Sequence, residues 1–146
     1  MKDMTPEFAQ PSSKPPFTGL DHIAIVVPNT DEALAVWQDR LGLTFLYSEV
    51  VNDGAVRLTH LDLGNTQLQL VEPLRADHPL KTWLNKNGSG LHHLCFKVED
   101  VDKARTAFEE NGLPPVAAPH QGTQGKRALF LERSATQNVQ IELTGK

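Results

Sequence analysis

Two segments of the chain share one pattern of hydrophobic and polar positions. Residues 20–27 (LDHIAIVV) and 91–98 (LHHLCFKV) alternate around a histidine, which is typical of β-strands. The second segment begins 71 residues after the first, and the same spacing joins Trp37 to Phe108. The chain therefore contains an internal repeat. Because a unit of about 70 residues buries little surface on its own, we expect the two units to share one core.

The first unit follows the order βαβββ. A helix is predicted after the strand at 20–27, with Asn29 or Thr30 as its N-cap, apolar residues at helical spacing, and Gly42 at its end. Three alternating segments follow, separated by Asn, Asp and Gly residues that favour turns. They predict strands over residues 44–51, 55–63 and 66–72.

The second unit repeats this order less regularly. A strand over 91–98 and a helix over 100–111 correspond to those of the first unit. Pro114 and Pro115 predict that the next strand is short, because proline cannot donate a backbone hydrogen bond. Two further segments complete the unit, over residues 128–132 and 139–143.

We therefore expect an α+β fold in which two tandem βαβββ modules form one curved mixed sheet. The modules span residues 19–73 and 90–144, and a connector with a short helix around residues 80–86 joins them. Together they make a single domain over residues 19–144. Residues 1–18 contain four prolines and no periodic pattern, which predicts a flexible leader.

Composition narrows the range of functions. The net charge is −4 and no run of Lys and Arg occurs, so we do not expect a nucleic-acid partner. No segment reaches the roughly 18 apolar residues of a membrane span. The N-terminus does not resemble a signal peptide, which favours a cytoplasmic location. The single cysteine, Cys95, leaves no internal disulfide and is expected to be a small buried residue.

Each unit supplies one histidine and one oxygen donor at matching positions. His22 lies 47 residues before Gln69, and His93 lies 49 residues before Glu142. Two imidazoles, a carboxylate and an amide carbonyl suit a divalent cation, namely cobalt, manganese, nickel, zinc or magnesium. Either histidine alone is more simply explained by a hydrogen bond within a strand. The metal-site hypothesis therefore depends on the repeat.

Several of these stretches resemble one protein family. The order of elements and the four donors are similar to those of the vicinal oxygen chelate superfamily, the glyoxalase, bleomycin resistance and dioxygenase proteins. Within it, the chain resembles the methylmalonyl-CoA epimerase family over about residues 19–144. The stretches that carry the resemblance are LDHIAIVVP at 20–28, LGNT at 63–66, LQL at 68–70, EPL at 72–74, GLHHLC at 90–95 and QIEL at 140–143.

The resemblance implies a glyoxalase-like fold and a metal-dependent epimerase. It implies one divalent metal ion held by four residues: His22, Gln69, His93 and Glu142. The metal would chelate the carboxylate and thioester oxygens of methylmalonyl-CoA, or of a related 2-methyl acyl-CoA, and stabilise the enolate. Glu142 would also be a catalytic acid or base. Relatives of the glyoxalase I type generally carry Glu where this chain has Gln69, so the glutamine favours the epimerase.

The sequence departs from that family at two places. Arg57 stands where the family has a second catalytic glutamate, and we expect it either to bind a substrate carboxylate or to be solvated. The segment ERS at 132–134 replaces the family's His-Pro-Lys, which would alter contacts with coenzyme A. Gly122, in a glycine loop, and Lys126 are further candidates for binding an anionic substrate.

Three histidines and two rival functions are left open. His60 and His78 are expected to be surface or packing residues, whereas His120, beside the glycine loop, is a candidate proton carrier. The first rival is a glyoxalase I-type lyase or isomerase that acts on a glutathione adduct. The second is a non-catalytic protein that sequesters a ligand, as resistance proteins do. Exposed sheet edges also favour a homodimer.

Overall fold

The structure is a computed structural model that describes residues 15–146. The leader predicted over residues 1–18 therefore lies mostly outside the described residues. Phe17, near its end, packs against Phe96 and Phe108, with ring centroids 4.9 and 6.4 Å away. These contacts join the start of the described chain to the second module.

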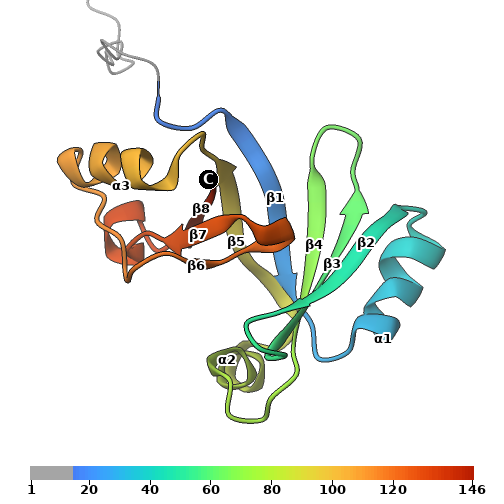
Figure 1. The fold of residues 1–146 in the computed structure, drawn as a ribbon. Helices are drawn as coiled ribbons and strands as arrows, with labels where there is room; N and C mark the ends of the chain where they lie inside the picture. Colours follow the sequence, from blue (N-terminus) through green and yellow to red (C-terminus); the bar gives the residue numbers. More distant parts are fainter. Residues whose placement is uncertain (1–14) are drawn as a thin grey trace, which may run out of the picture.

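Eight strands form one curled, mixed sheet (Figure 1). They are β1 (Gly19–Val26), β2 (Thr44–Val51), β3 (Val56–Asp62), β4 (Gln67–Pro73), β5 (Gly90–Lys97), β6 (His120–Gln121), β7 (Arg127–Phe130) and β8 (Ile141–Gly145). Their order across the sheet is β2-β3-β4-β1-β5-β8-β7-β6. β1 and β5 are antiparallel at the centre, and each has a parallel partner on its other side, β4 and β8 respectively. This symmetric order confirms the predicted α+β fold of two modules around one curved sheet.

Side chains at equivalent positions begin the first helix of each module. The helical elements are α1 (Thr30–Leu34), its π-helical continuation η1 (Ala35–Arg40), α2 (Pro79–Asn87), α3 (Val101–Glu110), and the 3₁₀ turns η2 (Thr123–Gly125) and η3 (Arg133–Thr136). Asn29 accepts a hydrogen bond from the backbone N–H of Glu32, and Asp100 accepts one from Lys103, each at 2.9 Å. Asn29 and Asp100 are 71 residues apart, so the repeat extends to the helix caps. No helix in the described part of the chain is long and apolar enough to cross a membrane.

Helices α1 and α3 lie at opposite outer sides of the curled sheet (Figure 1). Val101 and Phe108 of α3 are buried in a cluster with residues of β7 and β8. In the first module, Trp37 packs against a buried cluster that includes Leu61. Because the helices cover these faces, the other face of the central strands is left for a site.

One segment of the second module differs from its counterpart in the first. After Pro114, only a single bridge joins Pro115 to Leu131, and strand β6 does not begin until His120. The short strand expected after the two prolines is thus reduced to two residues and displaced along the chain. His120 and Gly122 therefore lie at the β6 edge of the curled sheet.

Candidate metal centre and active site

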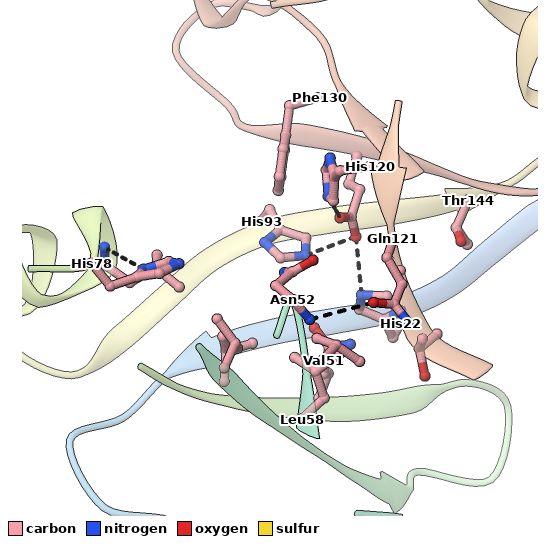
Figure 2. A pocket seen from close by; sticks show the side chains of 17 residues that line it. His22, Val51, Asn52, Leu58, His78, His93, His120, Gln121, Phe130 and Thr144 are labelled. Carbon is pink, nitrogen blue, oxygen red and sulfur yellow. Dashed lines mark hydrogen bonds and ion pairs between the residues drawn. The ribbon is translucent and has the colours of Figure 1, made fainter. Parts of the chain in front are cut away.

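A cavity of about 340 Å³ lies against the central strands (Figure 2). All four predicted ligands line it: His22 from β1, Gln69 from β4, His93 from β5 and Glu142 from β8. Strand pairing explains why they meet. Gln69 lies opposite Ala24, two residues after His22, and Glu142 lies opposite Cys95, two residues after His93. The two donor pairs are therefore equivalent in the sheet, although their spacings along the chain differ.

His22, His93 and Glu142 converge inside this cavity. The Oε1 atom of Glu142 lies 3.1 Å from Nε2 of His93 and 3.4 Å from Nε2 of His22. The two imidazole rings stand edge to face, with centroids 5.5 Å apart. One possible ligand atom from each residue lies within 4.8 Å of the other two. This spacing suits three ligands of a single cation.

The two Nε2 atoms test whether a cation fits. Both are buried and, within residues 15–146, neither has a hydrogen-bond partner of acceptable geometry. Buried polar atoms are nearly always satisfied, and each one left unsatisfied costs about 1–3 kcal/mol. A divalent cation would take up both lone pairs, and the carboxylate would balance part of its charge. The residues present therefore fit a divalent metal ion.

The far nitrogen of each imidazole is held by the preceding residue. Nδ1 of His22 lies 2.7 Å from Oδ2 of Asp21, a carboxylate oxygen that accepts the Nδ1 proton. Nδ1 of His93 lies 2.8 Å from Nδ1 of His92. If His93 donates in that bond, both Nε2 atoms keep their lone pairs for the cavity. Such outer partners commonly orient the ligands of a metal.

The electrostatics keep Glu142 ionised. Burial alone would raise the pKa of Glu142, but the charge of His93 and the close approach of the His120, His22 and His93 rings outweigh it and hold the pKa well below its usual range. Burial alone would lower the pKa of His22, yet the hydrogen bond to Asp21 and the nearby carboxylates of Glu142 and Asp21 raise it above its ordinary value. Glu142 is therefore a carboxylate at neutral pH, available to ligate a cation or to accept a proton.

Gln69 contacts His60, which the sequence predicted to be a surface or packing residue. His60 lies opposite Gln69 in the β3–β4 pairing, and its Nε2 atom is 3.1 Å from Nε2 of the glutamine. The His60 side chain is fully buried, and burial is the main cause that lowers its pKa to about 4. The sequence could have predicted this contact, because a hairpin that turns at residues 63–66 pairs residue 60 with residue 69.

Of the three predicted substrate-binding residues, one lines the cavity. Gly122 does, and a Cβ there would stand only 3.1 Å from the nearest side-chain atom, which favours glycine. Arg57 lies on the opposite face of β3, with its side chain 42% exposed and Nη1 3.8 Å from Oε1 of Glu72. Lys126 is not a lining residue either, and its Nζ lies 3.4 Å from Oδ1 of Asp21. The predicted role of Arg57 in binding a substrate carboxylate therefore does not fit its place on β3.

His120, the candidate proton carrier, reaches the carboxylate. Its Nε2 atom lies 3.7 Å from Oε2 of Glu142, and its ring stacks on Phe130. Figure 2 shows His120 and Phe130 on one side of the cavity, with Leu58 and Val51 on the other. Among the described residues that line the cavity, Glu142 carries the only carboxylate. The two sides therefore differ: one carries a carboxylate and an imidazole, whereas the other carries Leu58 and Val51 and no acid.

Comparison with known proteins agrees with this geometry. The sequence pattern of the Glyoxalase/Bleomycin resistance protein/Dioxygenase superfamily matches residues 21–130. The chain belongs to this superfamily. The resemblance to this superfamily, noted from the two histidine segments, is thereby confirmed.

Relatives of this glyoxalase-superfamily chain are similar along most of its length. The uncharacterised protein YqjC of Bacillus subtilis is 34% identical over 125 residues, which cover 85% of the chain and 89% of YqjC. The ethylmalonyl-CoA/methylmalonyl-CoA epimerase of Cereibacter sphaeroides is 33% identical over 127 residues, covering 85% and 95%. A solved structure of a Streptomyces coelicolor methylmalonyl-CoA epimerase variant with 2-nitronate-propionyl-CoA superposes with a TM-score of 0.80, 31% identity, and coverage of 89% and 98%.

Proposed function

We propose that this protein is a metal-dependent epimerase of methylmalonyl-CoA or of a related 2-methyl acyl-CoA. The observation that supports the proposal most directly is the convergence of two unpartnered, buried imidazole nitrogens on the ionised Glu142 inside one cavity. Relatives named as epimerases share about 30% of their residues with the chain. Together these favour proton transfer at a carbon next to a thioester.

The proposed cation ligands are His22, Gln69, His93 and Glu142. A divalent cation held there supplies Lewis-acid polarisation of the substrate oxygens. Asp21 and His92 keep the two imidazoles turned with Nε2 toward the cavity. Leu58 and Val51 supply an apolar wall against which a 2-methyl group can pack.

Glu142 is placed to move the proton. Its carboxylate takes the proton from C2 of the substrate, the carbon between the carboxylate and the thioester, and the electron pair left on C2 delocalises onto the thioester. His120 lies 3.7 Å from Oε2 of Glu142 and its side chain is 39% exposed. It therefore connects the carboxylate with solvent, so the abstracted proton exchanges with water before a proton returns to C2.

Inversion requires that the returning proton reach the opposite face of C2. The side of the cavity away from His120 carries Leu58 and Val51 and, among the described lining residues, no acid (Figure 2). We infer that the proton returns to the face it left more often than to the other face. Exchange with solvent should therefore be faster than epimerisation.

The test follows the hydrogen at C2. Each epimer of methylmalonyl-CoA is incubated in heavy water with protein reloaded with Co²⁺ after metal removal, and deuterium and configuration are measured separately. We expect deuterium in the recovered starting epimer before it accumulates in the other epimer. Loss of both signals in Glu142→Gln, with the fold intact by circular dichroism, is the matching control. No deuterium with cobalt-loaded wild-type protein would refute the epimerase.

The same experiment separates the rival functions. Binding of the thioester without exchange would favour a protein that sequesters its ligand. Turnover of a glutathione hemithioacetal in place of the CoA thioester would favour the glyoxalase I type, which Gln69 disfavours. The homodimer and the cytoplasmic location stay predictions, and sedimentation velocity of the purified protein tests the first.

A further inference from the structure

His60 stands at the centre of a buried row of polar side chains beside the cavity. Its Nδ1 atom lies 2.7 Å from Oε1 of Gln67, and its Nε2 atom lies 3.1 Å from Nε2 of Gln69. Its ring stacks on Tyr47, with centroids 4.5 Å apart and planes inclined by 12°. The proton transfer proposed above assigns no role to His60, although His60 touches one of the four proposed ligands.

We propose that His60 is a positioning residue that turns the side-chain amide of Gln69 so that its carbonyl oxygen faces the cavity. This inference rests on the proposed function, in which that oxygen is a ligand of the divalent cation. The glutamine amide has two ends of similar shape, and only the oxygen end can bind a cation. Something must therefore select the end that faces the site.

The hydrogen bonds of His60 make that selection. The Gln67 carbonyl oxygen can only accept, so Nδ1 of His60 carries the proton in that bond. A neutral imidazole has one N–H, which leaves Nε2 as an acceptor. The amide nitrogen of Gln69 donates to it at 3.1 Å. With its nitrogen held by His60, the amide of Gln69 directs its oxygen away from His60.

Both modules hold the ring in place. Tyr47 stacks on it from the first module, and Oγ1 of Thr123, from the second, lies 3.3 Å from Nε2. Thr123 is fixed in turn, because its hydroxyl donates to Glu49 at 2.7 Å and lies 2.7 Å from the hydroxyl oxygen of Tyr47. A fully buried ring with these neighbours cannot rotate freely. The orientation of Gln69 is thus determined by contacts between the two halves of the repeat.

Cation affinity, measured without substrate, tests the inference. Calorimetric titration with Co²⁺ alone compares wild type with His60→Leu, which fills the space but cannot accept a hydrogen bond. We expect binding to weaken by about 10-fold or more, the range typical of lost outer partners. His60→Gln, whose carbonyl can accept from Gln69, should recover most of the affinity. Thr59→Val is the matched control, because Thr59 is equally buried on β3 but contacts Ser48 at 2.9 Å instead of the site.

A second background separates positioning from a general loss of structure. In Gln69→Glu, either carboxylate oxygen can bind the cation, so no end needs to be selected. Adding His60→Leu there should therefore change the Co²⁺ affinity far less than it does beside glutamine. Equal losses in both backgrounds, or wild-type affinity in His60→Leu, would overturn the positioning role and leave the epimerase standing. Failure of wild-type protein to bind Co²⁺ would overturn both.

Discussion

Acid should weaken the fold of the metal-free protein through His60. The pKa of this buried histidine is lowered from 6.5 to about 4, mainly by burial, with the charge of His22 adding to the effect and the bond to Gln67 opposing it. Between these two values the unfolded chain binds a proton at residue 60 that the folded chain does not. The free energy of unfolding is therefore at its full value, as far as His60 is concerned, above about pH 6.5, and it falls as the pH drops toward 4.

The structure sets the size of this effect. A difference of about 2.5 in pKa, at about 1.4 kcal/mol for each unit, amounts to about 3 kcal/mol lost between pH 6.5 and pH 4. The steepest slope for one proton is about 1.4 kcal/mol per pH unit. Because the His60 side chain is fully buried, solvent does little to screen this contribution. The loss is a large part of the stability of a domain of this size.

Urea unfolding of wild type and His60→Leu measures this loss of stability. The titrations are followed by tryptophan fluorescence in the presence of EDTA, between about pH 4.5 and pH 7.5. The free energy of unfolding should fall more steeply with acid in the wild type than in the variant. The two slopes should differ by up to the value for binding one proton, about 1.4 kcal/mol per pH unit. Subtracting the two curves removes the contribution of His92, whose pKa is also lowered to about 4. Thr59→Val should keep the wild-type slope. A His60→Leu curve parallel to the wild type would refute the assignment of this acid sensitivity to His60.

Three further predictions test the site and the core. Glu142→Gln should slow deuterium exchange at C2 of methylmalonyl-CoA by about 100-fold or more, because the base is lost, as mass spectrometry of the recovered thioester can show. Phe108→Ala should lower the free energy of unfolding by about 3–5 kcal/mol in urea titrations, since the ring fills the core beneath α3. Cys95 is buried, and burial is the main cause that raises the pKa of its thiol, so iodoacetamide should label it only after unfolding, as intact mass will reveal. Native labelling at the unfolded rate would contradict the burial.

The order of elements followed from the hydrophobic pattern because the repeat gave each strand and helix a second copy. Asn29 and Asp100 illustrate this. Neither side chain is buried, yet each begins a helix by accepting the same backbone hydrogen bond. The sequence predicted a short strand after Pro114 and Pro115 but did not place it at β6, which pairs only with β7 at one edge of the sheet. Two residues carry too little pattern to be recognised along the chain.

The placement of Arg57 shows what family resemblance cannot decide. Neighbouring residues of a strand point to opposite faces, so an alignment that is displaced by one residue exchanges the cavity for the outer face. Leu58 lines the cavity, whereas Arg57 lies near Glu72 on the other side. Strand pairing in three dimensions shows which of the two residues faces the cavity. The apolar side chain of Leu58 on that side of the cavity is the physical reason for expecting solvent exchange to be faster than epimerisation.

The repeat is symmetric in its proposed ligands but not in the groups that hold them. Asp21 and His92 are 71 residues apart and contact Nδ1 of His22 and His93 in the same way. One partner is a carboxylate, whose charge favours a proton on His22, whereas burial lowers the pKa of the other, His92, to about 4. Duplication thus explains why two imidazoles meet at one carboxylate. Divergence at the preceding position means that the carboxylate of Asp21 favours a proton on His22, so protons compete with a cation at this ligand.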